Sequence, residues 1–187
     1  MNEDIRIVAF VGPAGAGKSA LAWRILDNFS DTEIVLSYTT RELRETDRPR
    51  EYQRLHTTVF DLLVEKGWFF AWNVGVHEKQ YGTSRASLNK VMMGEKRQII
   101  IVTPEAAEIL YKMFPKSSMF FFVCPPERRE LERRLIARGE TEQSADRRIK
   151  DCRHWLAESL DSPIPYVYIK NDGPIEKTFA TVESYFI

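Results

Sequence analysis

The sequence predicts an α/β fold built on a parallel sheet that helices cover on both faces. Apolar segments of strand length alternate along the chain with longer segments of helical periodicity. Several apolar segments contain no polar residue, as at residues 99–102 and 119–123, which is typical of strands in a parallel sheet. Because ligands of such sheets bind beyond the carboxyl ends of the strands, the residues that follow each strand are candidates for a functional site.

Five segments are predicted to be strands because each is an apolar run bounded by turn-forming or charged residues. Gly12 ends the first of them, and Pro125 with Pro126 ends the fourth. The predicted strands are residues 5–11 (IRIVAFV), 33–39 (EIVLSYT), 97–102 (RQIIIV), 119–124 (MFFFVC) and 165–171 (PYVYIKN).

Helices are predicted where apolar residues recur with a period close to 3.6 residues, as at residues 18–29, whose apolar side chains share one face. The other predicted helices are residues 58–66, 84–93 and 105–114, a strongly charged stretch from Glu127 to about Leu160, and a short helix at the end of the chain. Residues 41–54 (RELRETDRPREYQR) are too charged to pack and are predicted to form an exposed loop.

Composition excludes several classes of partner. The 187 residues are enough for one domain with a real core, and Lys+Arg and Asp+Glu both number 27, so net charge favours neither nucleic-acid nor membrane-surface binding. No apolar run reaches the roughly 20 residues that span a bilayer, and the acidic N-terminus does not resemble a signal peptide. The two cysteines form no CxxC pair, which predicts a reduced, cytoplasmic setting.

Residues 12–19, GPAGAGKS, follow the first predicted strand directly and lead into the first predicted helix. This is the GxxxxGK[ST] pattern of a phosphate-binding loop, in which backbone N–H groups and the helix N-terminus surround a phosphate. Lys18 can reach the β- and γ-phosphates, and Ser19 can ligate Mg²⁺. The residues predicted to bind the nucleotide here are Gly12, Ala14, Gly15, Ala16, Gly17, Lys18, Ser19 and Ala20. The motif by itself predicts nucleotide binding, whether in a kinase, an NTPase or a switch protein.

Three further clusters of polar residues follow the loop in the chain, within SYTTRELR and EY, within QYGTS, and within RRLIARG and RRI. Two arginines and two tyrosines that converge on one point would bind a phosphomonoester, because guanidinium groups match phosphate oxygens. Arg134 and Arg138 are four residues apart and so share one helix face, from which they could stabilise a transferred phosphoryl group. Taken singly, each cluster is also compatible with a solvated helix face or with packed tyrosines.

The order and spacing of these segments resemble those of the guanylate kinase family over nearly the whole chain, through GPAGAGKSAL, SYTTRELR, EY, QYGTS, PPERRELERRLIARG and KND. The resemblance implies one domain in three parts: a core with five parallel strands (residues 1–36, 91–125 and 154–187), a small subdomain that binds a nucleoside monophosphate (37–90) and a helical lid (126–153). It implies ATP and Mg²⁺ as cofactors and a monomer or homodimer. The roles it implies are acceptor binding by Ser37, Arg41, Arg44, Tyr52, Tyr81 and Thr83, catalysis by Lys18, Arg134, Arg138 and Arg148, and contact with the adenine of ATP by Asn171.

The chain departs from the family where guanine is read. The family uses two carboxylates, because N1 and N2 of guanine are hydrogen-bond donors, and Ala71 and Thr103 stand at the two matching positions. The aspartate that the family places near the metal is Ile101 here. Glu78 or Glu105 could replace a missing carboxylate, and GMP is predicted to be a poor substrate that is weakly preferred over other acceptors.

The missing aspartate bears on the reaction type. A kinase that phosphorylates a hydroxyl needs a base, commonly Asp, whereas a phosphate acceptor is already largely ionised at pH 7. The sequence therefore predicts a nucleoside-monophosphate kinase of uncertain base. The alternatives are a sugar-phosphate kinase resembling ribose 1,5-bisphosphate phosphokinases and, disfavoured by the intact phosphate loop, a non-catalytic binding module.

Overall fold

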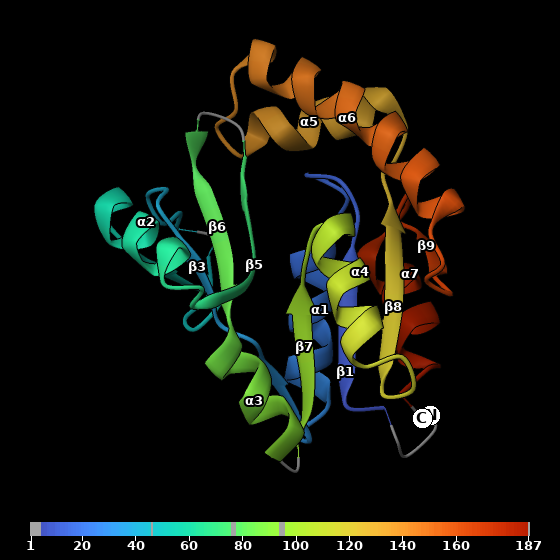
Figure 1. The fold of residues 1–187 in the computed structure, drawn as a ribbon. Coiled ribbons are helices and arrows are strands. Elements are labelled where there is room, and N and C mark those ends of the chain that lie inside the picture. Colours follow the sequence, from blue (N-terminus) through green and yellow to red (C-terminus); the bar gives the residue numbers. More distant parts are fainter. Residues whose placement is uncertain (1–4, 46, 76–77, 94–95, 187) are drawn as a thin grey trace.

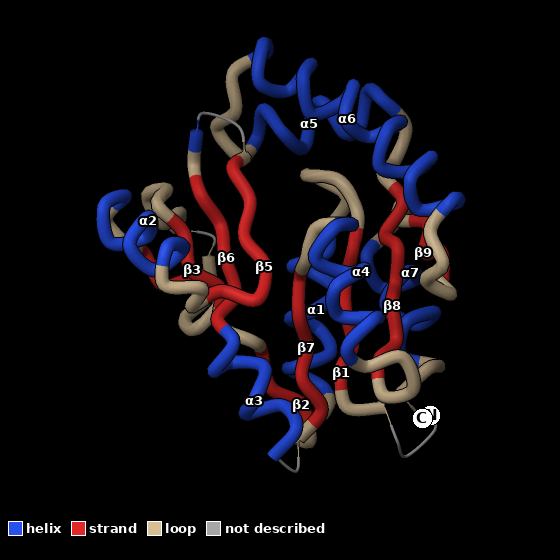
Figure 2. Tube along the Cα trace, in the orientation of Figure 1, coloured by secondary structure: helices blue, strands red, loops and turns tan. Residues whose placement is uncertain are grey.

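The computed structural model describes residues 5–45, 47–75, 78–93 and 96–186, apart from the side chains of residues 89–92. It contains two sheets and a pair of helices that lie over the carboxyl ends of the larger sheet (Figures 1 and 2). Within the described residues, no helix is both long and apolar enough to cross a membrane.

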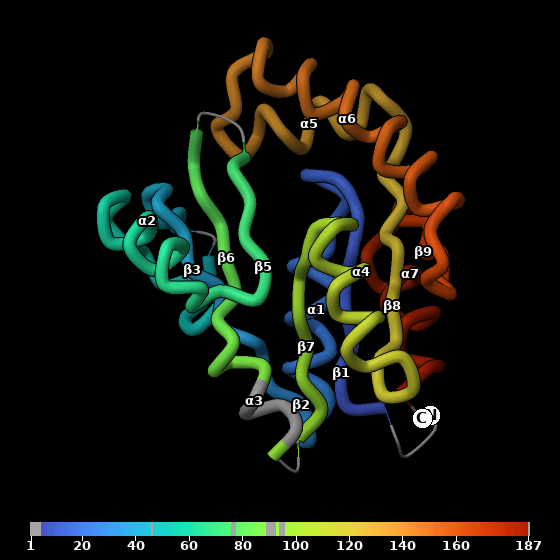
Figure 3. Tube along the Cα trace, in the orientation of Figure 1, coloured from blue at the N-terminus to red at the C-terminus, as the bar shows by residue number. Residues whose placement is uncertain are grey.

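The larger sheet has five strands in the order β2-β7-β1-β8-β9, and every neighbouring pair is parallel. The strands are β1 (Ile7–Val11), β2 (Thr32–Ile34), β7 (Arg97–Ile101), β8 (Ser118–Cys124) and β9 (Val167–Lys170). Figure 3 shows β1 between β7 and β8, two strands that come much later in the sequence. The predicted five-stranded parallel core is therefore confirmed, with strand ends within two residues of the prediction except at β2.

Helices cover both faces of this sheet because its strands alternate their side chains between two apolar cores. Ile7, Ala9 and Val11 of β1 pack on the side of helix α4 (Pro104–Met113), whereas Val8 and Phe10 pack on the other side. Helices α1 (Lys18–Asn28) and α7 (Ile175–Glu183) supply the second layer with apolar residues such as Ile25 and Phe179. The sheet is thus buried on both faces, as its unbroken apolar strands predicted.

The smaller sheet has the order β4-β3-β6-β5 and lies beside the larger sheet, next to β7 in Figure 1. Its strands are β3 (Ser37–Thr39), β4 (Tyr52–Arg54), β5 (Phe69–Val74) and β6 (Gln80–Ser84), and helices α2 (Thr57–Glu65) and α3 (Arg85–Met93) adjoin it. β3 pairs parallel with β4 and antiparallel with β6, so Ser37 and Thr83 are direct neighbours.

Two sequence predictions are wrong in this region. The single strand predicted at residues 33–39 is two strands in different sheets, because the chain leaves the core after the Val35 N–H donates to the Ile99 carbonyl at 2.8 Å. The segment 41–54 is not an exposed loop throughout, since Arg41 and Glu51 are only 8% and 5% exposed and its last residues form β4. Arg41 and Glu51 can be buried because their charged groups are hydrogen-bonded, Arg41 to Asp47 and Glu51 to Ser19 and Trp23.

The charged stretch after β8 is two helices, α5 (Arg128–Ala137) and α6 (Glu142–Asp161), separated by a turn at Gly139, whose φ is 84°. Leu131 and Leu135 of α5 pack with Ala145 and Cys152 of α6, and Ala14 of the phosphate loop packs against this cluster. The pair of helices is therefore seated on the phosphate loop rather than extended into solvent.

Candidate active site

The phosphate loop, residues 12–17, joins β1 to α1 and lies against the core at two glycines. Gly12 (φ 138°) and Gly17 (φ 102°) have backbone angles that other residues rarely adopt. A Cβ atom on Gly12 would collide with the Val123 carbonyl, and one on Gly17 with the amide of Asn171. The glycines therefore let the loop curl tightly at the end of β1, where its N–H groups can face a phosphate.

Asn171 follows β9, and its side chain, which is 3% exposed, is hydrogen-bonded to the phosphate loop. Its Nδ2 donates to the Ala16 carbonyl at 2.6 Å, and its Oδ1 accepts from the Thr178 hydroxyl at 3.2 Å. Asn171 thus stabilises the loop that carries the nucleotide motif, while its expected contact with adenine stays a prediction.

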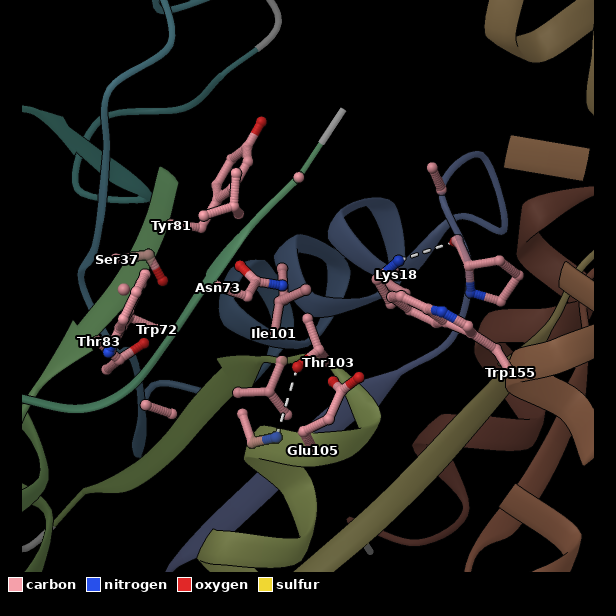
Figure 4. A pocket seen from close by; sticks show the side chains of 18 of the residues that line it. Lys18, Ser37, Trp72, Asn73, Tyr81, Thr83, Ile101, Thr103, Glu105 and Trp155 are labelled. Carbon is pink, nitrogen blue, oxygen red and sulfur yellow. Dashed lines mark hydrogen bonds between the residues drawn. The ribbon is translucent and has the colours of Figure 1, made fainter. Parts of the chain in front are cut away.

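Lys18 begins α1, and its ammonium lies inside the phosphate loop (Figure 4). Nζ donates to the carbonyls of Gly12 at 2.6 Å and Pro13 at 2.8 Å. Burial, together with the charges of Arg138 and Arg148, lowers the pKa of Lys18 to about 7. Positive charge is therefore concentrated around the phosphate loop, and an anion bound there would be stabilised.

A bound nucleotide should reverse this pKa shift, because phosphate charge favours the ammonium form of Lys18. Above pH 7 the lysine is largely neutral in the free protein, so ATP binding at pH 8 should be accompanied by uptake of about one proton. Calorimetry at pH 8 in buffers of different ionisation enthalpy measures this uptake, at a pH where the ATP phosphates are fully ionised. The variant Lys18→Met should show none, and binding enthalpies that are equal in all buffers for the unaltered protein would contradict the prediction.

Ser19, the next residue of α1, is hydrogen-bonded to a carboxylate from the small sheet. Its Oγ donates to Oε1 of Glu51 at 3.0 Å, and Trp23 Nε1 donates to Oε2 of the same residue at 2.9 Å. A hydroxyl and a carboxylate are the hard oxygen groups that Mg²⁺ prefers. The residues around Ser19 therefore fit a magnesium ion, although Ile101 provides no ligand at the end of β7.

A cavity of about 960 Å³ opens between the phosphate loop, the small sheet and the start of α4. It is large enough for a nucleotide-sized ligand. The sequence-predicted residues that line it are Ala14, Lys18, Ser37, Tyr52, Tyr81, Thr83 and Arg148. The other predicted residues are not part of its lining: Gly12, Gly15, Ala16, Gly17, Ser19, Ala20, Arg41, Arg44, Arg134, Arg138 and Asn171.

On the small-sheet side, the side chains of Arg41, Tyr52 and Tyr81 lie close together. The Arg41 guanidinium lies 4.8 Å from the centre of the Tyr52 ring, and the rings of Tyr52 and Tyr81 are 6.4 Å apart, edge to face. Arg41 also donates to both carboxylate oxygens of Asp47, at 2.6 and 2.9 Å, which fixes the guanidinium plane. Burial raises the pKa of Tyr52 to about 12, so its hydroxyl remains a hydrogen-bond donor at neutral pH.

One carboxylate, Glu140 in the turn between α5 and α6, pairs with two of the predicted arginines, Arg148 and Arg44. Its side chain is 8% exposed and pairs with Arg148 at 3.0 Å and with Arg44 at 3.5 Å. Although burial acts to raise it, the Ser144 hydrogen bond and these two arginines lower the pKa of Glu140. Glu140 thus links helix α6 to Arg44 of the segment 41–54.

Arg138 differs from the other lid arginines. Arg134 pairs with Glu130 at 2.8 Å, whereas the Arg138 guanidinium makes no hydrogen bond or ion pair with any residue in the described part of the chain. Partial desolvation and the charges of Arg44 and Arg134 lower the pKa of Arg138, which still leaves it protonated. A guanidinium that has no direct partner and lies among other cations favours an anion, such as a phosphoryl group, at this point.

At the end of the cavity away from the phosphate loop, the two positions that depart from the resemblance are not equivalent. Ala71 lies in β5 opposite Thr83, and Thr103 caps helix α4, where its hydroxyl accepts from the Ala106 N–H at 3.4 Å. Glu105 and Asn73 line the cavity there, and Figure 4 shows both side chains directed into it. Glu78 does not line it.

Comparison with known proteins agrees with this geometry. A family model described as guanylate kinase matches residues 4–187. The chain belongs to the guanylate kinase family. The guanylate kinases of Chlamydia felis and Syntrophotalea carbinolica are 31% and 35% identical to it over 184 and 177 residues, which cover 97% and 93% of this chain and 87% and 82% of theirs.

A crystal structure of guanylate kinase from Anaplasma phagocytophilum has the same fold. It superposes with a TM-score of 0.72 at 19% identity and covers 97% of this chain and 83% of that one. The predicted family, fold and enzyme class, that of a nucleoside-monophosphate kinase, are therefore confirmed for this guanylate kinase family member.

Three acidic residues of the site were missed by sequence reasoning: Glu51, Asp47 and Glu140. Each binds a predicted site residue, namely Ser19, Arg41 and Arg148 respectively. Asp47 and Glu51 lie in the segment 41–54, where a high density of charge suggested solvent exposure. The one available signal was the position of Glu51 beside Tyr52, a residue already assigned to the site.

Proposed function

We propose that this guanylate kinase family member transfers the γ-phosphoryl group of ATP to the phosphate of a nucleoside monophosphate whose base it reads with few hydrogen bonds. One observation carries the proposal. A complete phosphate loop and an arginine–tyrosine cluster flank a single cavity, and an arginine lid lies over the loop. A donor phosphate on the loop and an acceptor phosphate on the cluster would thereby be brought together.

The chemistry needs positioning and positive charge. An oxygen of the acceptor phosphate forms a bond to the γ-phosphorus, and the bond from that phosphorus to the β–γ bridging oxygen breaks, so that ADP leaves with the electron pair. The acceptor oxygen is already ionised at neutral pH, and no base is needed to remove a proton. The reaction therefore needs no catalytic base at the end of β7, where Ile101 stands.

We assign the roles on the same basis. The phosphate loop and the start of α1 (residues 12–20), including Lys18, bind the phosphates of ATP. Ser19 would bind Mg²⁺, and the metal would supply charge neutralisation at the β- and γ-phosphates. Arg138, Arg148 and Arg134 of the lid stabilise the transferred group. The acceptor phosphate is bound by Arg41, Arg44, Tyr52 and Tyr81, and Ser37 with Thr83 faces its base. In this proposal the larger sheet, the small sheet and the helices α5 and α6 are the core, the acceptor subdomain and the lid.

The base-reading end favours Glu105 over Glu78 as the group that replaces the missing carboxylates. Glu105 lines the cavity from the first turn of α4, and Asn73 lines it from β5, on the same strand face as Ala71. The Glu105 carboxylate can accept hydrogen bonds from both N1 and N2 of guanine. However, Glu105 is solvent-exposed, so the bonds it forms would discriminate less strongly than those of a buried acceptor.

A side-by-side panel of kcat/KM values, measured by ADP release, tests the function and the base together. The acceptors are GMP, dGMP, AMP, CMP, UMP and ribose 1,5-bisphosphate. We expect nucleoside monophosphates to be phosphorylated, with GMP leading the others by much less than the about 10⁴-fold discrimination that a site with fully matched hydrogen bonds achieves. Activity confined to the sugar bisphosphate would contradict the proposed acceptor class.

The variant Glu105→Gln should lower kcat/KM for GMP by about 10-fold, which corresponds to loss of one hydrogen bond to a charged group, and should leave CMP unchanged. Glu78→Gln is the matched control, because that residue is a nearby exposed glutamate outside the cavity lining. An equal loss for GMP and CMP would mean that Glu105 does not read the base.

A further inference from the structure

Glu51 is a buried carboxylate that neither the phosphate-loop motif nor the acceptor cluster accounts for. It is 5% exposed, and each of its oxygens receives one neutral donor from α1, Ser19 Oγ at 3.0 Å and Trp23 Nε1 at 2.9 Å. It forms no ion pair with any residue in the described ranges. A buried carboxylate without a direct cationic partner is costly, which indicates that its charge has a use.

The backbone holds Glu51 firmly in this position. Its carbonyl accepts from the Ser37 N–H at 3.1 Å, and its own N–H donates to the Arg48 carbonyl at 3.1 Å. Glu51 directly precedes Tyr52, the first residue of β4, so the small sheet determines where the carboxylate meets α1. Its negative charge contributes to raising the pKa of Tyr52 and acts in the same direction on Arg138.

The direction of the hydrogen bond to Ser19 is informative. A serine hydroxyl has one proton and two lone pairs. Because the proton is donated to Glu51, both lone pairs remain available to a cation on the phosphate side of the residue. A carboxylate that accepts the proton of a ligating group fixes its orientation and increases its basicity, as second-sphere carboxylates do in metal sites.

We propose that Glu51 is the carboxylate that supports the nucleotide's Mg²⁺ in this chain, by orienting the Ser19 hydroxyl toward the metal and by supplying negative charge that the apolar Ile101 does not. Glu51 is thus a positioning residue that acts through Ser19. This inference rests on the proposed function, since it takes Mg·ATP as the ligand of the phosphate loop.

The test compares binding of a non-hydrolysable ATP analogue in EDTA and at increasing Mg²⁺, measured by calorimetry on the full chain. In Glu51→Gln the side chain loses its negative charge. Its amide oxygen can accept from only one side of the residue, so Ser19 and Trp23 no longer each have a carboxylate oxygen to donate to. We expect analogue binding in EDTA to be unchanged or stronger, and the increase in affinity that Mg²⁺ produces to be about 10- to 100-fold smaller than in the unaltered protein. Glu42→Gln, an exposed glutamate of the same segment that pairs with Arg54, is the matched control and should keep the full increase.

A second variant distinguishes a metal effect from general damage to the loop. Adding Ile101→Asp to Glu51→Gln should restore much of the Mg²⁺-dependent increase, because Ile101 lines the cavity together with Lys18 and an aspartate there would add negative charge next to the phosphate loop. If Glu51→Gln does not fold, Glu51→Asp, which keeps the charge but withdraws it from Ser19, is measured in its place.

Two results would overturn the inference: a full Mg²⁺-dependent increase without the Glu51 carboxylate, or a loss of affinity that is equal in EDTA and in Mg²⁺. Failure of the proposed function would look different. In that case the unaltered protein would not bind the ATP analogue at all, whatever the metal concentration.

Discussion

Replacing Lys18 with alanine is expected to lower kcat for phosphoryl transfer by about 10²–10³-fold or more while the protein remains folded. The ammonium is the cation that lies inside the phosphate loop, at hydrogen-bond distance from its Gly12 and Pro13 carbonyls. There it should stabilise negative charge that develops in the transition state, and loss of one such preorganised donor costs about 10²–10³-fold. The side chain is not part of either apolar core, so its removal should not destabilise the fold.

The measurement is steady-state ADP release with the best acceptor, accompanied by thermal denaturation of both proteins. Because the pKa of Lys18 is lowered to about 7 by burial and by Arg138 and Arg148, loss of the ammonium also relieves repulsion in the free protein. The melting temperature of Lys18→Ala should therefore not fall. Lys112→Ala, at an exposed position in the last turn of α4, is the control and should retain full activity. Unchanged turnover in Lys18→Ala would remove the basis for the kinase assignment.

The core of the fold could be predicted from sequence because its signals are local. Strands β1, β7 and β8 are continuous apolar runs, and the periodicity of α1 places Leu21, Ala22 and Ile25 on the buried face. The phosphate loop was predicted for the same reason, since its residues are consecutive and its glycines respond to local geometry. In such segments, neighbouring residues carry most of the structural information.

The small sheet was harder to predict because its strands are short and depend on distant partners. Residues 33–39 form an uninterrupted β-type sequence, and nothing within them shows that residues 32–34 pair with β7 while residues 37–39 pair with β6. In the same way, the charged segment 41–54 reads as solvent-exposed until its pairing is known. Arg41 and Asp47 neutralise each other at 2.6 Å, and that pairing is what permits their burial.

The supporting carboxylates of the site could not be predicted because they act across large sequence separations. Glu51 is 32 residues from Ser19, and Glu140 is 96 residues from Arg44. Resemblance to a family transfers the residues that match its motifs, but it does not reveal which group compensates where a motif residue is changed. The sequence offered Glu78 and Glu105 equally for the missing carboxylates, and only the three-dimensional arrangement placed Glu105 in the cavity lining and Glu78 outside it. Asn73 and Glu51 were not identified from the sequence at all.

The sequence predicted one shared role for Arg134, Arg138 and Arg148, but it did not show that their environments differ. Arg134 and Arg138 are four residues apart, yet Arg134 is paired with Glu130 while the Arg138 guanidinium has no partner in the described part of the chain. Arg148 shares Glu140 with Arg44. This difference makes Arg138 the arginine that is most available to a phosphoryl group, and the one whose removal should have the largest effect on rate.

Arg138→Ala is accordingly expected to lower kcat by about 10³-fold, the scale of arginines that stabilise a phosphoryl-transfer transition state, with a much smaller change in KM for the acceptor. Arg138 ends α5 at the edge of the lid, and its charge contributes to lowering the pKa of Lys18, so the two cations act on the same region. An interaction made mainly in the transition state affects kcat rather than ground-state binding.

Stopped-flow or quenched-flow measurement of a single turnover separates the chemical step from product release. Arg129→Ala, an exposed arginine of the same helix, is the matched control and should leave both constants unchanged. If Arg138→Ala instead raises only KM for the acceptor, the residue belongs with Arg41 and Arg44 in binding the acceptor phosphate, and Arg148 becomes the arginine expected to act on the transferred group.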